Sequence, residues 1–244
     1  MIPLHDDNPT EITPVVTIAL IVACALVFFY EASLPQELAE AFIFRYGAIP
    51  AVLLGHEAES QGLPPDVVAL PVFASLLTSM FLHGGWMHLI GNMLYLWIFG
   101  NNIEDAMGHG RFVIFYVTCG VLAALSHALI DPASAVPMVG ASGAISGVLG
   151  AYLLLYPHAR VLVLIPLGFF SRVMYVPAGF VLGFWFVLQL LSGGLSLGRQ
   201  GGGVAFFAHI GGFLAGMALI GLFKRPEVRF FAPRRHWSRW HSDW

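Results

Sequence analysis

Charged side chains are the scarcest feature of this chain of 244 residues. Aspartate, glutamate, lysine and arginine occupy only 25 positions, 14 acidic and 11 basic, where a soluble domain of this length would carry roughly 60. Hydrophobic residues make up 58% of the chain, and the mean hydropathy is +0.79. Because so few polar side chains cannot cover a water-facing surface, the composition excludes an ordinary soluble protein and predicts one embedded in a lipid bilayer.

Cysteine and an excess of positive charge are lacking as well. Cys24 and Cys119 both lie in apolar runs, and two such residues cannot form a disulfide framework or a multi-thiolate metal site. The net charge of −3 lacks the basic footprint of a nucleic-acid binder. The motif HExxH does not occur, which argues against a zinc protease. We therefore expect neither a nucleic-acid partner nor a metal.

Long apolar stretches are abundant. About 20 apolar residues span about 30 Å of hydrocarbon, and the candidate stretches lie near residues 14–30, 85–100, 112–130, 136–156, 173–191 and 205–223. The first follows an acidic leader without a cleavage site, which favours a retained helix over a signal peptide. The sequence predicts an all-α, polytopic membrane protein, with one six-helix domain over residues 1–223 and a short basic tail over 224–244.

The basic residues predict the orientation of these spans. Six spans place both termini, and the connections near 101–111 and 157–172, on the same side of the membrane. That side holds nine of the lysines and arginines, whereas the other side holds only Arg45 and Arg199. Since basic residues accumulate in the cytoplasm, both termini are expected there. The chain shows no targeting extension, so the expected location is the cell membrane of a prokaryote.

The two connections on the opposite side differ from simple turns. Residues 31–84 contain short apolar patches interrupted by prolines, and interfacial or re-entrant structure is expected there. Residues 192–203 contain six glycines, and this composition predicts a flexible segment.

Polar side chains inside apolar spans are costly, and each is a candidate functional residue. His88 and Asn92 lie four residues apart in the second span, so they share one helical face. Ser142 lies in the sequence GASGAISG of the fourth span, and His209 lies near the start of the sixth. These three spans run in the same direction, so the sequence predicts that the four residues share one layer close to the extracytoplasmic surface.

Pairs of glycines predict close packing of the spans that carry Ser142 and His209. Small residues spaced by four let helix backbones approach each other, and the two pairs are Gly143 with Gly147 and Gly212 with Gly216. Such packing would bring the serine within hydrogen-bond reach of the histidine. A serine beside a histidine is the minimal pair of nucleophile and base.

A more ordinary interpretation exists for each residue alone. A serine in a glycine-rich membrane helix is usually a packing residue, and a lone membrane histidine is as often structural as functional. We assign Ser146 to packing and His83 to bracing the site. The shared depth of the four residues above is not explained by separate packing roles.

Three motifs carry a resemblance to a known family: HxxxN at His88 and Asn92, GASG from Gly140 to Gly143, and AHxxGxxxG from Ala208 to Gly216. In this order they resemble the rhomboid family of intramembrane serine proteases, over residues 75 to 223. The resemblance implies a six-helix bundle whose long first loop lies partly in the membrane. It implies no metal and no cofactor.

The resemblance also implies roles for single residues. Ser142 matches the nucleophile and His209 the general base of the family, while Asn92 and His88 match its oxyanion-stabilising pair. The implied supporting residues are His83, Gly140, Gly143, Gly212 and Gly216. Glu104 and Gly108 look like the turn that follows the second span in the family.

Two departures from the family pattern concern the surroundings of the site. The first loop has only Phe44 and Arg45 where many members carry a Trp-Arg pair. Ser146 occupies the position where some members place an aromatic residue against the catalytic histidine. What orients His209 is left open, with Tyr152 and Phe206 as candidates.

The predicted function is an intramembrane serine endopeptidase that cleaves transmembrane helices near the extracytoplasmic face. Its partners would be single-span or polytopic membrane proteins within the lipid bilayer. An alternative is a non-catalytic rhomboid-like protein that binds or escorts membrane clients. A small transporter or channel is a third possibility, although its polar residues would be distributed through the depth of the membrane.

Overall fold

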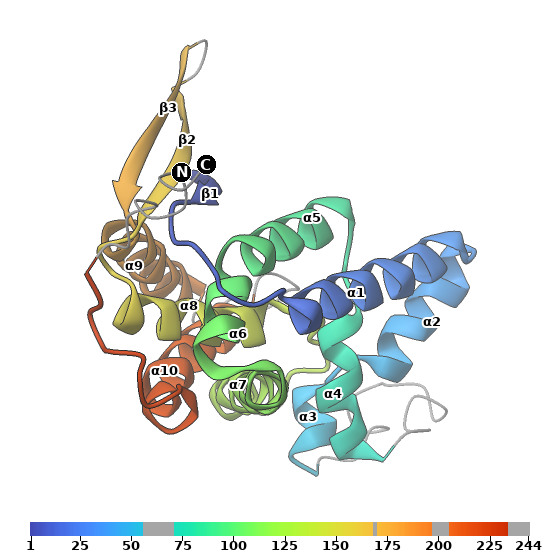
Figure 1. Cartoon of the computed structure of the whole chain (residues 1–244). Coiled ribbons are helices and arrows are strands. Elements are labelled where there is room, and N and C mark those ends of the chain that lie inside the picture. Colours follow the sequence, from blue (N-terminus) through green and yellow to red (C-terminus); the bar gives the residue numbers. More distant parts are fainter. Residues whose placement is uncertain (56–70, 168–169, 197–204, 234–244) are drawn as a thin grey trace.

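Helices occupy all six predicted positions in the computed structural model, which describes residues 1–55, 71–167, 170–196 and 205–233 (Figure 1). The helical elements at those positions are α1 (Val15–Ser33), α5 (Trp86–Tyr95) with η5 (Leu96–Gly100) and α6 (Asn101–Met107), α7 (His109–Ile130), α8 (Ser142–Leu155), α9 (Ala178–Ser196) and α10 (Phe206–Phe223). Within the described residues, α1, α7, α9 and α10 are long and apolar enough to cross a membrane. The protein is thus a polytopic helical membrane protein, while the count of six spans stays a prediction.

The other two predicted spans have different forms. The second is helical from Trp86 to Met107, but its π-helical η5 divides it into α5 and α6. The fourth is shorter than predicted, because α8 begins only at Ser142 and residues 136–141 are not helical.

The fifth span begins and ends later than predicted. Residues 173–177 belong to a strand, and α9 runs from Ala178 to Ser196. A short apolar run does not by its periodicity distinguish a strand from a helix, so the prediction joined the two. The predicted flexible segment 192–203 is also wrong at its start, since residues 192–196 are helical; residues 197–204 lie outside the described part of the chain.

An antiparallel sheet, which the sequence analysis did not predict, joins the N-terminus to the connection between α8 and α9. Its strands are β1 (Ile2–Asp6), β2 (Arg160–Leu167) and β3 (Phe170–Pro177), in the order β1-β2-β3. Ile2 lies opposite Leu164, and Arg160 lies opposite Pro177. The hairpin of β2 and β3 projects away from the helices (Figure 1).

Residues 56–70 of the predicted interfacial segment 31–84 lie outside the described part of the chain, and the described remainder after α1 contains short helices. They are α2 (Gln36–Tyr46), α3 (Pro50–Leu53), η3 (Val72–Ala74), α4 (Ser75–Thr78) and η4 (Ser79–Phe81). An isolated bridge between Ala48 and Met138 ties this segment to the residues that precede α8. The same segment therefore forms one wall beside the start of α8.

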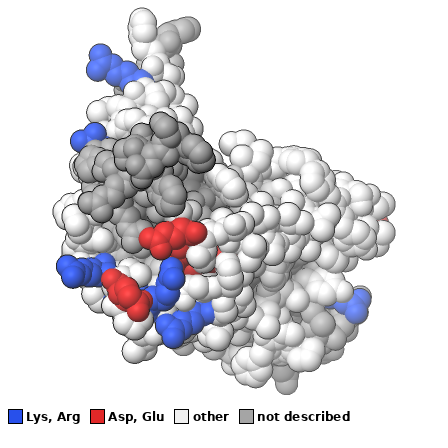
Figure 2. All heavy atoms as spheres, in the orientation of Figure 1, with Lys and Arg blue, Asp and Glu red and all other residues white. Residues whose placement is uncertain are grey.

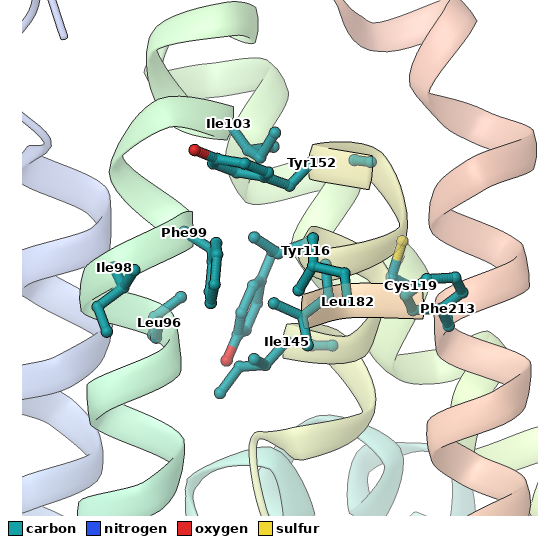
Figure 3. Packing of buried hydrophobic residues seen from close by; sticks show 14 of the residues in the cluster. Leu96, Ile98, Phe99, Ile103, Tyr116, Cys119, Ile145, Tyr152, Leu182 and Phe213 are labelled. Atoms are coloured by element: carbon teal, nitrogen blue, oxygen red, sulfur yellow. The ribbon is translucent and has the colours of Figure 1, made fainter. Parts of the chain in front are cut away.

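Large side chains fill the middle of the bundle. Figure 3 shows Phe99, Tyr116 and Tyr152 between the ribbons of η5, α7 and α8. Phe99 and Tyr152 are fully buried and meet edge to face, with ring centroids 5.0 Å apart. Because these rings fill the centre, the polar side chains gather in two separate regions, one at each end of the bundle.

Glycines bring α8 and α10 into backbone contact. A Cβ atom on Gly212 would collide with the carbonyl oxygen of Gly143, and one on Gly216 would collide with that of Gly147. Any larger residue would force the two helices apart. The two glycine pairs singled out in the sequence therefore face each other across one seam.

Buried carboxylates link the helices at the end of the bundle that lies away from the starts of α8 and α10. The Glu104 side chain on α6 is fully buried and accepts hydrogen bonds from the backbone of Val16 at 2.9 Å and of Thr17 at 2.7 Å, at the start of α1. It also accepts one from the Thr17 hydroxyl at 2.7 Å and contacts His109 Nδ1 at 2.6 Å. His109 had no role in the sequence analysis. Figure 2 shows charged atoms gathered around this region, with further basic groups on the hairpin.

Candidate active site

Ser142 and His209 lie in direct contact. Ser142 is the first residue of α8 and His209 lies in the first turn of α10, and Ser142 Oγ is 2.8 Å from His209 Nε2. The glycine seam between α8 and α10 permits this approach. The structure therefore brings together the two residues that the sequence identified as nucleophile and base.

The second ring nitrogen of His209 contacts a residue that the sequence analysis missed. Nδ1 lies 2.8 Å from Oε1 of Gln189, on α9. Trp185, one turn earlier on the same helix, has its ring centroid 5.9 Å from that of His209. Gln189 could have been found by the rule that identified the other candidates, because it is a polar residue in an apolar span.

His88 and Asn92 converge on Gly140, two residues before Ser142. A Cβ atom built on Gly140 would meet His88 Nε2 at 2.7 Å and Asn92 Nδ2 at 3.5 Å. Gly140 has a φ of +120°, a conformation that other residues rarely adopt. Only glycine therefore fits between these two side chains and the start of α8.

Both side chains present donors at this point. The backbone N–H of Gly84 donates to His88 Nδ1 at 3.3 Å, so a neutral His88 carries its proton on Nε2. Asn92 Nδ2 is buried and has no hydrogen-bond partner among the described residues. A buried amide donor without a partner is rare in native structures. The arrangement leaves two N–H groups directed at one place next to Ser142.

His83, in the short segment before α5, supports His88 from the side. The two rings meet edge to face, with centroids 5.2 Å apart. The His83 side chain is fully buried and its Nδ1 donates to the carbonyl of Phe81 at 3.2 Å. Burial, reinforced by the neighbouring His88, lowers the pKa of His83 to about 4, so this ring is neutral at physiological pH.

A small apolar pocket opens beside Ser142. Its walls come from α7, α8, the start of α10 and the loop before α8, and they are made largely of glycine and alanine. The lining includes Gly120, Ala123, Ala124, Gly143, Ala144 and Ala208. Met80 of η4 and Met138 also line the pocket. The pocket suits a small apolar side chain.

Other candidates from the sequence lie away from His209. The Ser146 hydroxyl donates to the Ser142 carbonyl at 2.6 Å, which is a packing role. The Tyr152 hydroxyl bonds to Asp6 at 2.6 Å, so Tyr152 does not orient His209. Among the described residues, no three histidine, cysteine or acidic side chains gather as metal ligands would.

Comparison with protein families identifies the family of the chain. The family model described as the Rhomboid domain matches residues 72–226, which is more than half of the chain. The chain belongs to the rhomboid family. The matched range contains Ser142, His209, Gln189 and both donors near Gly140.

Curated rhomboid relatives come from several kinds of organism. The chain is 32% identical over 147 residues to "Rhomboid protein 1, mitochondrial" of Saccharomyces cerevisiae, covering 59% of this chain and 40% of that protein. It is 35% identical over 144 residues to "Rhomboid protease GluP" of Bacillus subtilis, covering 59% and 25%. It is 33% identical over 176 residues to "Presenilin-associated rhomboid-like protein A, mitochondrial" of Danio rerio, covering 67% and 43%. The chain thus spans less than half the length of each of these relatives.

Proposed function

We propose that this rhomboid-family chain is an intramembrane serine endopeptidase with Ser142 as nucleophile and His209 as base. The observation that carries the proposal is the 2.8 Å contact between Ser142 Oγ and His209 Nε2. A serine hydroxyl is inert until a neighbouring base removes its proton. This contact, at the start of two apolar helices, supplies that base at membrane depth.

Each catalytic step has a group to perform it. His209 takes the proton of Ser142 as the oxygen attacks the substrate carbonyl, and then gives that proton to the departing amine. Water enters next: His209 takes its proton as the water oxygen attacks the acyl carbonyl, and His209 then gives that proton to the Ser142 oxygen as the acyl bond breaks. The products are two peptide segments and the regenerated serine.

The proposed oxyanion site lies next to Gly140. Asn92 Nδ2 lacks a hydrogen-bond partner within the described part of the chain, and His88 Nε2 points at the same place. Ser142 opens α8, so its own backbone N–H has no acceptor within the helix. Donors arranged in advance around a developing negative charge stabilise the transition state strongly.

The substrates we propose are single-span or polytopic membrane proteins. A helix conceals its carbonyls in its own hydrogen bonds, so the substrate must unwind locally to reach Ser142. The small pocket beside Ser142 would hold an alanine-sized side chain next to the cleaved bond. With both termini in the cytoplasm, as the basic residues favour, cleavage takes place near the extracytoplasmic face. We place the protein in a prokaryotic cell membrane.

The proposal is tested by reconstituting the protein in liposomes with a single-span substrate. Ser142→Ala and His209→Ala should each abolish cleavage, because one removes the nucleophile and the other its base. Matched controls are Ser126→Ala, which removes a hydroxyl bonded only within α7, and His158→Ala at an exposed position. Both controls should cleave at the wild-type rate.

Undiminished cleavage by either site variant would refute the assignment. Labelling with a fluorophosphonate gives a second measurement, since it reports an activated serine without any substrate. A folded wild-type protein that neither cleaves nor labels would instead favour a client-binding, non-catalytic protein.

A further inference from the structure

Gln189 contacts the side of His209 that faces away from Ser142. Its Oε1 lies 2.8 Å from His209 Nδ1, while His209 Nε2 lies 2.8 Å from Ser142 Oγ. The three side chains come from α9, α10 and α8, and they form one continuous chain of hydrogen bonds. We propose that Gln189 is the positioning residue of the site, which fixes the orientation and tautomer of the base.

This inference rests on the proposed protease function and follows from the chemistry of the amide. A carbonyl oxygen only accepts hydrogen bonds, so His209 Nδ1 must donate its proton to Oε1. Neutral imidazole has one ring proton, and Nε2 is then left as an acceptor. That is the state in which His209 can take the proton of Ser142. Without Gln189, both the other tautomer and a rotated ring become accessible.

The packing of α9 on α10 explains how Gln189 reaches His209. Trp185, Gln189 and Gly193 are four residues apart, so they lie along one face of α9. Gly193 lies opposite the first turn of α10, where an added Cβ atom would be 3.4 Å from Phe206 Cβ. Phe186 stacks on Phe213 with ring centroids 4.4 Å apart. These contacts hold α9 at the distance from α10 that the hydrogen bond between Gln189 and His209 requires.

A glutamine suits this position better than a carboxylate in one respect. An ionised acid within the membrane is expensive to bury, whereas a neutral amide orients the ring at a much lower desolvation cost. The amide lacks the negative charge that would stabilise a protonated histidine. Replacing Gln189 with glutamate introduces that charge and keeps the acceptor, so this variant tests the contact directly.

The experiment measures kcat and KM for cleavage by reconstituted wild type, Gln189→Met and Gln189→Glu. Methionine has a similar length but no acceptor, and kcat should fall about 10- to 100-fold with a smaller change in KM. Labelling of Ser142 by a fluorophosphonate should slow in parallel. Ser196→Ala, which removes a hydroxyl on the same helix that bonds to the Gly193 carbonyl, should leave both rates unchanged.

Gln189→Glu should recover most of kcat, and the pH below which its activity falls should rise, because a carboxylate beside the ring favours the protonated form. A merely structural role would not move this profile, so an unmoved profile overturns the inference. Wild-type kcat in Gln189→Met, or a change in KM alone, also overturns it. If Gln189→Met fails to fold, the profile of Gln189→Glu decides. Failure of the proposed protease function would be recognised separately from failure of the Gln189 role, because Ser142→Ala would then cleave at the same rate as the wild type.

Discussion

The two ends of the helix bundle treat their polar groups differently. At the end where α5, α8 and α10 begin, Asn92 Nδ2 and His83 Nε2 are buried, and no described residue forms a hydrogen bond with either. At the other end, the Glu104 carboxylate makes four polar contacts and leaves neither oxygen unpaired. Buried polar groups are normally satisfied, so unpaired ones suggest a waiting ligand or intermediate. The comparison separates the end that carries the proposed active site from the end whose carboxylates are fully paired.

Neighbours of Glu104 follow the same pattern. The Asp105 carboxylate accepts from the backbone of Glu11 and Ile12, both at 3.3 Å, and contacts the Arg225 guanidinium at 3.4 Å. These bonds join the leader of α1 and the segment after α10 to α6. Asn102 leaves only Oδ1 unpaired there, since its Nδ2 donates to the carbonyl of Asn8 at 2.8 Å.

The largest expected effect concerns Asn92. Asn92→Ala should lower kcat about 10²- to 10³-fold, because it removes one donor to the proposed oxyanion. It should leave thermal stability in detergent close to that of the wild type, since Nδ2 has no partner to lose. Cleavage rates and a melting curve on one preparation measure both. A large loss of stability together with normal kcat would show that Asn92 stabilises the fold and does not take part in catalysis, which would contradict the contrast between the two ends.

Sequence alone predicted which residues the structure brings together beside the start of α8, for a physical reason. Ser142, His209, His88 and Asn92 are polar residues in apolar spans, and three spans running in the same direction place all four at one depth. The glycine spacing then predicted that α8 and α10 approach each other, as the collisions at Gly212 and Gly216 show.

The same reasoning should have found Gln189. It lies in the second half of α9, which runs opposite to the other three helices, so its later residues share the depth of their first turns. The sheet was beyond this reasoning, because pairing of Ile2 with Leu164 joins residues far apart in sequence. The partners of Glu104 could not be predicted for the same reason, because they lie in the first turn of α1, far from Glu104 in the sequence.

An intermediate effect is expected at the stabilising end. Glu104→Ala removes the acceptor for two backbone N–H groups of α1, and it should lower the free energy of unfolding by about 2–3 kcal/mol. The activity of the folded fraction should remain close to wild type. Unfolding in a detergent of increasing denaturing strength measures this loss. The exposed Glu37→Ala on α2 is the matched control, and an equal change in both variants would contradict the assigned role.

The last prediction is a pH dependence of stability that differs in sign between the ends. Burial raises the pKa of Asp6 on β1 to about 7, although its hydrogen bond from Tyr152 opposes this shift. The folded protein then holds this proton more tightly than the unfolded chain, whose aspartate has a pKa of about 4. Asp6 therefore makes the protein less stable as pH rises from about 4 to 7, by at most about 1.4 kcal/mol per pH unit.

His83 should act in the opposite sense. Its pKa of about 4 in the folded protein lies below the ordinary value of 6.5, so the unfolded chain binds the proton more readily and stability rises with pH between about 4 and 6.5. The test compares unfolding of wild type, Asp6→Asn and His83→Gln across this range. Relative to each variant, the wild type should lose stability with rising pH through Asp6 and gain it through His83. Equal slopes in all three proteins would show that neither group is buried as described, and the contrast between the two ends would then rest on Asn92 and Glu104 alone.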